Sequence, residues 1–134
     1  MTILSGITWL QSQLRTITGV MSAPDYPGGG QLPIIITHLD TGEITAGNPL
    51  GANKELNNIM VELHVSQSGN DTESFKVLET LHPLVVAKLI ADYTLNGSVD
   101  TWENVTFSTL RGTLDGVPVV SRIYTINNVK VISC

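Results

Sequence analysis

Three histidines and a glutamate are the residues of this chain whose types could bind a metal ion or act as a general base. They are His38, His64, His82 and Glu62. A preorganised metal site often has two histidines one helical turn apart, and the chain has no His-x-x-x-His spacing. His38 and His64 are expected on separate strands of unknown register, and His82 falls in a helical region. We therefore expect ordinary histidines at the surface or at the edge of the core, and no metal.

The motifs of phosphate binding and nucleophilic catalysis are missing. The three glycines at 28–30 are not followed by Lys and Ser or Thr and do not open a helix, so we interpret them as a flexible loop. The chain has no Gly-x-Ser-x-Gly elbow, and its single cysteine, Cys134, is the last residue. Trp9 and Trp102 could stack on a ligand, but tryptophans more often anchor a core or an interface. We expect no catalytic residue and no cofactor.

Two pairs of acidic residues are close enough in sequence to suggest a general acid and base. Asp71 with Glu73 falls where a helix is expected to begin, and Asp100 with Glu103 falls in a polar turn before a strand. Carboxylates at a helix N-terminus cap free N–H groups and interact favourably with the helix dipole. Acid–base catalysis requires burial that shifts a pKa, and these polar contexts do not indicate burial. We interpret both pairs as structural.

The composition indicates one folded domain with little charge. The chain has 134 residues, of which 42% are hydrophobic and only 14% are charged. Seven basic and twelve acidic residues give a formal net charge of −5, with no cluster of Lys or Arg. Nucleic-acid affinity depends on basic residues that neutralise phosphates, so tight binding of DNA or RNA is not expected. The start of the chain lacks the pattern of a signal peptide, and no apolar stretch approaches the roughly 18 residues of a membrane span.

The first segment has the spacing of an amphipathic helix. Apolar residues follow one another at steps of four, three, four and three, with Thr2 placed as the N-cap and Gly19 as the stop. Gly6 weakens the local helix propensity, so packing of the apolar stripe is expected to hold the helix. Residues 22–32 contain two prolines and three consecutive glycines and are predicted to be a loop. The apolar stripe consists of Ile3, Ile7, Leu10, Leu14 and Ile17.

Two strands are predicted next, separated by a long connection. Residues 33–39 contain three successive isoleucines after a proline, which is typical of a buried strand. Residues 40–56 contain three glycines, a proline and two asparagines and are predicted to be a connection, with residues 40–43 as a turn that begins a short hairpin. A connection of this length usually has a function, most often binding. Residues 59–65 alternate in hydrophobicity, as in a half-buried strand.

A second helix is predicted after residues 68–73, which supply a cap and first-turn acids. Helical apolar spacing continues from there to Tyr93, and Gly97 closes the segment. Pro83 interrupts the run, because proline lacks an N–H donor and clashes with the preceding turn. We predict a kink or a break near His82, with Pro83 opening a second helix if the run is broken.

A β-hairpin is predicted at the end of the chain. Residues 105–114 and 117–126 flank Asp115-Gly116, the strongest short hairpin signal in the sequence. Residues 129–132 are predicted to continue the last strand after a bulge at 127 and 128. The order helix, strand, strand, helix, strand, strand predicts an α+β fold, in which two helices pack on one sheet of about four mainly antiparallel strands. The whole chain, residues 1–134, is expected to form this single domain.

Several short motifs occur in a particular order. The first helix runs into Ile-Thr-Gly-Val at 17–20, and Pro-Asp-Tyr-Pro at 24–27 and a Gly-rich spacer precede Leu-Pro-Ile-Ile-Ile at 32–36. Val-Glu-Leu-His-Val at 61–65, Leu-His-Pro-Leu at 81–84 and the terminal Asp-Gly hairpin follow. Together these motifs resemble the tail terminator, or tail completion, proteins of long-tailed bacteriophages over nearly the whole chain. The glycine run at 28–30 and the stretch 40–56 depart from what that family requires.

The resemblance implies a subunit that forms a homo-oligomeric ring, a hexamer in that family, at the head-proximal end of the tail tube. Such a ring ends tube polymerisation and joins the tail to the head. Its partners are copies of itself, the tail tube protein and the head-tail connector or head-closure protein. DNA passes through the ring without specific binding, and no membrane, cofactor or catalytic residue is involved. The protein would be located in the virion tail or neck, and in the host cytoplasm during assembly.

Two other interpretations stay open at this point. One is a different structural ring protein of the phage neck or tail, such as a head-closure or tube-related protein. The other is a small cytosolic enzyme or ligand-binding domain, which would need an enclosed pocket. A closed ring in solution favours the structural roles, whereas a monomer that binds a ligand favours the last one.

Asp40, Glu43 and Glu55 are the candidate interface or lumen residues. They lie in or beside the predicted long connection, where Lys54 is the only nearby basic residue. If the chain lines a channel, acidic side chains repeated around a ring make the lumen negative and keep DNA phosphates from adhering to the wall. The alternative is that these carboxylates only keep a surface of low charge soluble.

Overall fold

The computed structural model describes residues 3–25, 30–45, 53–67, 71–114 and 116–133. In chain order these form α1 (Ile3–Leu14), β1 (Ile34–Thr45), β2 (Asn53–Ser66), α2 (Asp71–Leu89), β3 (Asn104–Leu114) and β4 (Val117–Ser133). This order and the antiparallel pairing confirm the predicted α+β fold. The proposed cap at Thr2, the glycines at 28 and 29, Asp115 and Cys134 lie outside the described residues.

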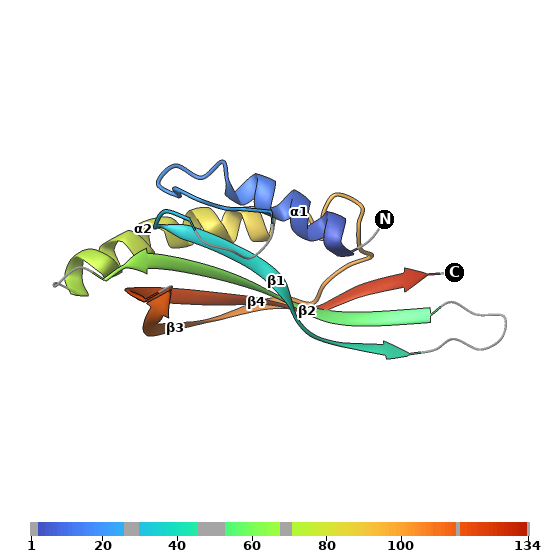
Figure 1. Cartoon of the computed structure of the whole chain (residues 1–134). Helices are drawn as coiled ribbons and strands as arrows, with labels where there is room; N and C mark the ends of the chain where they lie inside the picture. Colours follow the sequence, from blue (N-terminus) through green and yellow to red (C-terminus); the bar gives the residue numbers. More distant parts are fainter. Residues whose placement is uncertain (1–2, 26–29, 46–52, 68–70, 115, 134) are drawn as a thin grey trace.

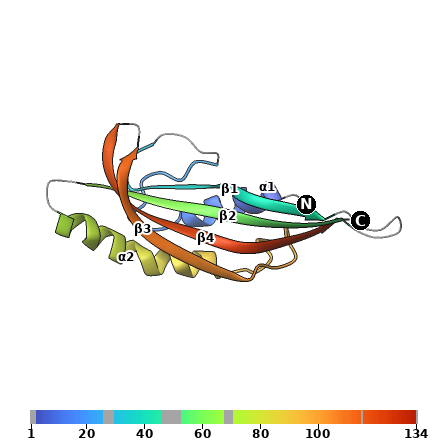
Figure 2. The ribbon, with the colours of Figure 1, turned by 90° about the horizontal axis from the view of Figure 1, so that it is seen from below.

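The four strands form one antiparallel sheet in the spatial order β1-β2-β4-β3. Both helices lie on the same face of this sheet (Figure 1), and the opposite face, which we call the helix-free face, carries no helix of the described chain (Figure 2). The hydrophobic core lies between helices and sheet, with Leu10 and Leu14 of α1, Val85 of α2 and Tyr124 of β4 among its buried members. None of the described helices is long and apolar enough to cross a membrane.

β2 shows the alternation that its sequence predicts. The side chains at the odd positions from 59 to 65 are buried in the core. Because successive side chains of a strand point to opposite faces, Glu62 and His64 project from the helix-free face. The burial of one face of β2 therefore determines where its polar residues lie.

α1 places its apolar stripe against the core as predicted, but the helix ends at Leu14, not near Gly19. Ile17 is still buried, because residues 15–19 continue as turns beside the core. Gly6 permits a close approach, since a Cβ at this position would lie 3.1 Å from Ser98 Cβ. The glycine that weakens the helix locally thus allows α1 to contact the segment after α2.

The prediction of a long connection at residues 40–56 is wrong. β1 continues to Thr45 and β2 begins at Asn53, so the connection is confined to residues 46–52, which are outside the described part. A register shift between Leu39 and Thr41 makes Asp40 a bulge, after which residues 41–45 pair with residues 54–58. Residues 40–43 are therefore strand and not a turn. Pairing with a neighbouring strand overrides the weak strand propensity of these polar residues and glycine.

Of the predicted kink or break near His82, the break does not occur, because α2 is a single helix with Pro83 inside it. Pro83 is exposed, so its ring does not disturb the core. Burial of the opposite side of the helix offsets the backbone hydrogen bond that proline cannot make. That side buries Leu78, Leu81, Val85 and Leu89.

The predicted helical run to Tyr93 is too long, because α2 ends at Leu89. Beyond it, Leu95, Asn96 and Gly97 all have positive φ angles. Backbone of this kind turns the chain sharply and ends helical geometry. The chain then returns to the sheet and enters β3 at Asn104.

β3 and β4 form the predicted hairpin, with residues 114 and 117 paired at its end. The predicted bulge in β4 is confirmed. The register of β2 against β4 shifts between Asn57 and Ile59, which leaves Asn127 and Asn128 opposite the single residue Asn58. Asn128 has a φ angle of 56°, a conformation that asparagine tolerates better than most residues.

Candidate functional site

One end of the sheet extends beyond both helices and forms an arm (Figure 1). The arm consists of residues 40–45 of β1, 53–58 of β2 and 130–133 of β4, which are paired side by side. β3 does not reach it, because the first residue of β3, Asn104, pairs with Asn127. Among the described residues, the β4 edge of the arm is paired only through an isolated bridge between Thr101 and Lys130. The arm is therefore a three-stranded ribbon without the helical cover of the rest of the sheet.

The outer edge of β1 is open along the arm. β1 is an edge strand, and within the described residues only Ser22, which bridges Ile34, covers the start of that edge. Residues 39–45 are all exposed, and the side chain of Ile44 is 74% exposed. An open strand edge presents free N–H and C=O groups to which another chain can pair. The arm therefore combines an exposed apolar side chain with a strand edge that is open to pairing, on one projecting element.

The three acidic candidates lie on this arm but do not form one cluster. Asp40 is the bulged residue at its root, Glu43 pairs with Leu56, and Glu55 pairs with Ile44. Paired residues share a face of the sheet, and neighbours along a strand alternate. Glu43 and Glu55 therefore project from opposite faces of the arm. A single acidic surface made of all three residues is not formed within one copy of the chain.

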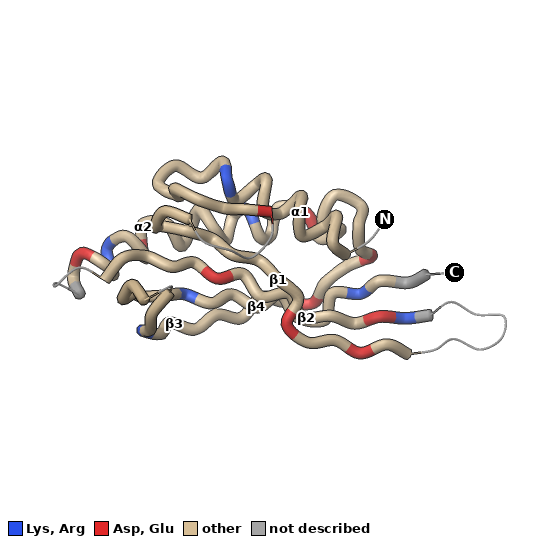
Figure 3. The backbone as a smooth tube through the Cα atoms, in the orientation of Figure 1, with Lys and Arg blue, Asp and Glu red and all other residues tan. Residues whose placement is uncertain are grey.

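Basic residues are present on one of these two faces. Lys54 pairs with Thr45 and Lys130 pairs with Leu56, so both lysines share the face of Glu43. Figure 3 shows acidic and basic positions together on the strands of the arm. The face of Glu43 thus carries charges of both signs, whereas the face of Glu55 combines a carboxylate with apolar residues of β1 and β4.

The strand register also brings together three titratable residues on the helix-free face, where β1 and β2 approach the arm. His38 Nε2 lies 2.6 Å from Glu62 Oε2, and His64 Nε2 lies 3.1 Å from Glu62 Oε1. On the other side of the His64 ring, Nδ1 lies 2.5 Å from Ser121 Oγ of β4. This contact could not be recognised in the sequence, because it depends on the pairing of β1 with β2.

The chain of contacts from Ser121 through His64 to Glu62 contains the residue types of a catalytic triad. However, Ser121 is only 1% exposed. A nucleophile has to be reached by its substrate, so Ser121 Oγ is not available for attack in this arrangement. No group of three or more His, Cys, Asp and Glu side chains in the described part of the chain is arranged to hold a metal ion. What the structure shows here is a set of side chains in mutual hydrogen-bond contact that joins β1, β2 and β4.

His82 lies apart from the other histidines, on the helix side of the sheet. Its Nδ1 lies 2.6 Å from the Tyr124 hydroxyl, and its ring centroid lies 4.8 Å from that of Phe107. Burial, followed by the positive charge of Arg122, lowers the pKa of His82. Glu79 and His82 form the one Glu-x-x-His spacing of the chain, a pattern visible in the sequence. Glu79 is nevertheless engaged elsewhere, because its Oε1 accepts a hydrogen bond from Arg122 Nη2 at 2.6 Å.

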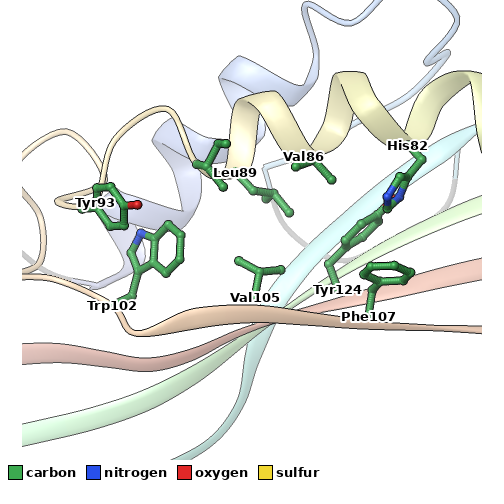
Figure 4. A pocket seen from close by; sticks show the side chains of 9 residues that line it. His82, Val86, Leu89, Tyr93, Trp102, Val105, Phe107 and Tyr124 are labelled. Atoms are coloured by element: carbon green, nitrogen blue, oxygen red, sulfur yellow. The ribbon is translucent and has the colours of Figure 1, made fainter.

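An open groove of about 370 Å³ lies between the second half of α2 and β3 (Figure 4). Tyr93 and Phe107 at its rim are more than half exposed. Trp102 is buried and stacks on Tyr93 with ring centroids 4.7 Å apart, which agrees with its interpretation as an anchor. No acceptor for Trp102 Nε1 is found among the described residues. The lining is apolar and aromatic and comprises His82, Val86, Leu89, Ile90, Tyr93, Trp102, Val105, Phe107 and Tyr124.

In comparisons with known proteins, no family model matches the chain, and no curated protein matches it.

Proposed function

We propose that this protein is a structural subunit that assembles with copies of itself into a ring at the head-proximal end of a bacteriophage tail tube. The resemblance of its motifs to tail terminator proteins motivates the proposal, and the α+β fold is compatible with it. The observation that carries it is the arm, which has no helical cover and, within the described residues, no partner on the outer edge of β1.

A ring requires two different patches on each subunit, one for each neighbour. The arm supplies one patch at the β1 edge of the sheet. The groove supplies a second, because it lies beside β3, the strand at the opposite edge. Exposed apolar side chains occur at both places, Ile44 on the arm and Phe107 in the groove. Two separate apolar patches on opposite edges of one small domain favour contacts that continue from subunit to subunit.

The mechanism in this proposal is steric and needs no catalytic residue. The ring would occupy the end of the tail tube, prevent the addition of further tube protein and present its other surface to the head-tail connector or head-closure protein. DNA would pass through without specific binding, which agrees with the formal net charge of −5. Within the virion, the protein would be located in the tail or neck.

Native mass spectrometry at rising protein concentration tests assembly directly. We expect wild-type protein to form a closed oligomer, with the hexamer as the species that the resemblance implies. Ile44→Asp should shift the distribution to the monomer, because it places a charge on the exposed apolar position of the arm. Leu84→Asp is the matched control, since Leu84 is 43% exposed on α2, away from the arm. Circular dichroism of both variants shows whether the fold is kept.

Detection of only monomer and symmetric dimer, both alone and in the presence of assembled tails, would contradict the ring. If Ile44→Asp and Leu84→Asp weaken assembly equally, the proposed role of the arm is contradicted. A reconstruction of intact particles distinguishes a terminator from another ring protein, such as a head-closure or tube-related protein. A terminator lies at the head-proximal end of the tube, whereas the alternatives lie elsewhere along the tail axis.

A small ligand-binding domain is the second candidate function, and the groove is the observation that favours it. Its size and its apolar, aromatic lining fall within the range of small-molecule sites, but the groove is open and not the enclosed pocket that this interpretation requires. Titration of the monomer with the dye 1-anilinonaphthalene-8-sulfonate tests whether the groove accepts an apolar aromatic compound. Val86→Phe should abolish dye binding if the dye occupies the groove. Ring assembly without dye binding favours the structural role, and dye binding by a persistent monomer favours the ligand-binding role.

A further inference from the structure

His38 and His64 contact the same carboxylate, but their second ring nitrogens face different kinds of partner. In His64, Nε2 faces Glu62 Oε1, which can only accept when the carboxylate is ionised, and Nδ1 faces the Ser121 hydroxyl, which can donate or accept. A neutral imidazole has one donor and one acceptor nitrogen, which matches these two partners.

His38 has two acceptors as partners. Its Nδ1 lies 2.9 Å from the carbonyl oxygen of Leu39, and its Nε2 lies 2.6 Å from Glu62 Oε2. With Glu62 ionised, either neutral tautomer of His38 sets a nitrogen lone pair against an oxygen lone pair. The imidazolium form donates a hydrogen bond to each partner. The geometry therefore favours a proton on both ring nitrogens of His38.

The charged groups around His38 favour this additional proton. Glu62 and His64 face it from β2, Asp40 lies two residues further along β1, and the residues of β4 that pair with Glu62 and His64 are uncharged. Burial lowers the pKa of His38. The Leu39 carbonyl and the nearby carboxylates raise it by more, so the net shift is upward. The pKa thus agrees with the hydrogen-bond geometry.

We propose that His38, Glu62 and His64 form a proton-operated latch between β1 and β2 at the root of the arm. His38 stands two residues before the bulge at Asp40, where β1 leaves the body of the sheet. With its extra proton bound, the His38 side chain ties β1 to β2 at this point. Without that proton, the neutral ring keeps a hydrogen on one nitrogen only, so one of its two contacts sets lone pair against lone pair, and the charge attraction between His38 and Glu62 is lost. The protonation of His38 then controls how firmly the β1 part of the arm is held.

The direction of the pH effect follows from thermodynamic linkage. A group whose pKa is higher in the folded state contributes stability that is fully present below its unfolded value and is lost as the pH rises through its folded value. The ordinary value for His38 is 6.5. The latch therefore holds most firmly in mildly acidic solution and weakens as the pH rises above that value. If the arm mediates assembly, which rests on the proposed function, assembly also weakens as the pH rises.

Nuclear magnetic resonance on dilute, monomeric protein tests the latch between about pH 5 and about pH 9, the range in which histidines titrate. The ¹⁵N signals of the His38 ring should report hydrogens on both nitrogens at the acidic end and a titration midpoint above 6.5. Amide exchange of residues 41–45, corrected for the intrinsic pH dependence of exchange, should show protection that falls as His38 loses its proton. Use of the monomer separates this test from the test of the ring.

Two variants and a matched control complete the experiment. Glu62→Gln should lower the His38 midpoint and remove the pH dependence of arm protection, and His38→Asn should remove that dependence without changing Glu62. Glu43→Gln makes the same chemical change on the arm but outside the cluster, so it should behave as wild type. A wild-type His38 midpoint at or below 6.5 overturns the proposal. The proposal is also overturned if the amide protection of residues 41–45 still depends on pH in Glu62→Gln or in His38→Asn.

Discussion

The side-chain carbonyl of Gln11 accepts a hydrogen bond of 2.5 Å from the Thr37 hydroxyl, in the buried space between α1 and β1. The same amide donates from Nε2 to the carbonyl oxygens of Pro24 and Ile35, at 2.7 Å and 3.0 Å. Gln11 is completely buried and Thr37 is nearly so. One polar side chain therefore joins the first helix, the following loop and the first strand, and it satisfies polar groups that would otherwise be buried without partners.

Gln11→Ala should be among the most destabilising substitutions in α1. It leaves the Thr37 hydroxyl and the Pro24 and Ile35 carbonyls without this partner and creates a cavity, for a combined cost of about 2 to 4 kcal/mol in the free energy of unfolding. Urea denaturation followed by circular dichroism measures the loss. Gln13→Ala, on the same helix, is the control, because Gln13 is only half-buried. Equal losses for the two variants would show that the buried amide is not a special contact.

Pro83→Ala should stabilise the protein. Pro83 lies inside α2 on its exposed side, where alanine restores a backbone donor without disturbing the core. The expected gain is about 1 to 3 kcal/mol, because proline is the least favourable residue in a helix interior. Pro118→Ala serves as the control, since it removes a proline from β4 without restoring a helical hydrogen bond. A loss of stability in Pro83→Ala would mean that the proline shapes α2 in a way that the core requires.

Deprotonation of the Tyr124 hydroxyl should destabilise the folded protein in alkaline solution. Burial raises the pKa of Tyr124 to about 12 from an ordinary value of 10.0, although Arg122 acts in the opposite direction. The contribution of the neutral phenol is complete below the unfolded value and is lost as the pH rises through the folded value. Denaturant midpoints of wild type should therefore fall between about pH 10 and about pH 12. Tyr124→Phe should lack this part of the decline, and Tyr93→Phe should keep it. Equal declines in wild type and Tyr124→Phe would refute the assignment.

Glu43→Lys and Glu55→Lys should have different effects on the passage of DNA in the proposed ring, because the two side chains project from opposite faces of the arm. Only one face of the arm can line a channel. A lysine on that face would attract DNA phosphates and slow ejection from virions, and high salt would relieve the defect. Changing Asp40, Glu43 and Glu55 together should reproduce the stronger single effect. Normal ejection by virions with the triple change would show that these carboxylates do not line the route.

The sequence alone determined the features that depend on local spacing. The apolar stripe of α1 and the alternation of β2 are visible as periodicities, because one face of each element has to be buried. The hairpin turn before Val117 and the bulge at Asn128 can be recognised from the types of residue at these positions. Few residues tolerate the backbone conformations of turns and bulges. Together these signals were sufficient for the α+β order of elements.

Only the tertiary structure decided which residues meet. The arm is strand in spite of its polar residues and glycines, because hydrogen bonds from the neighbouring strands stabilise it, and α2 continues through Pro83 because the core binds its opposite side. His38 meets Glu62 only in the register of β1 against β2, and Gln11 is satisfied only where α1 crosses β1. Periodicity predicts which face of an element is buried, but register and packing depend on contacts between segments distant in the chain, and a single sequence carries no local signal for them.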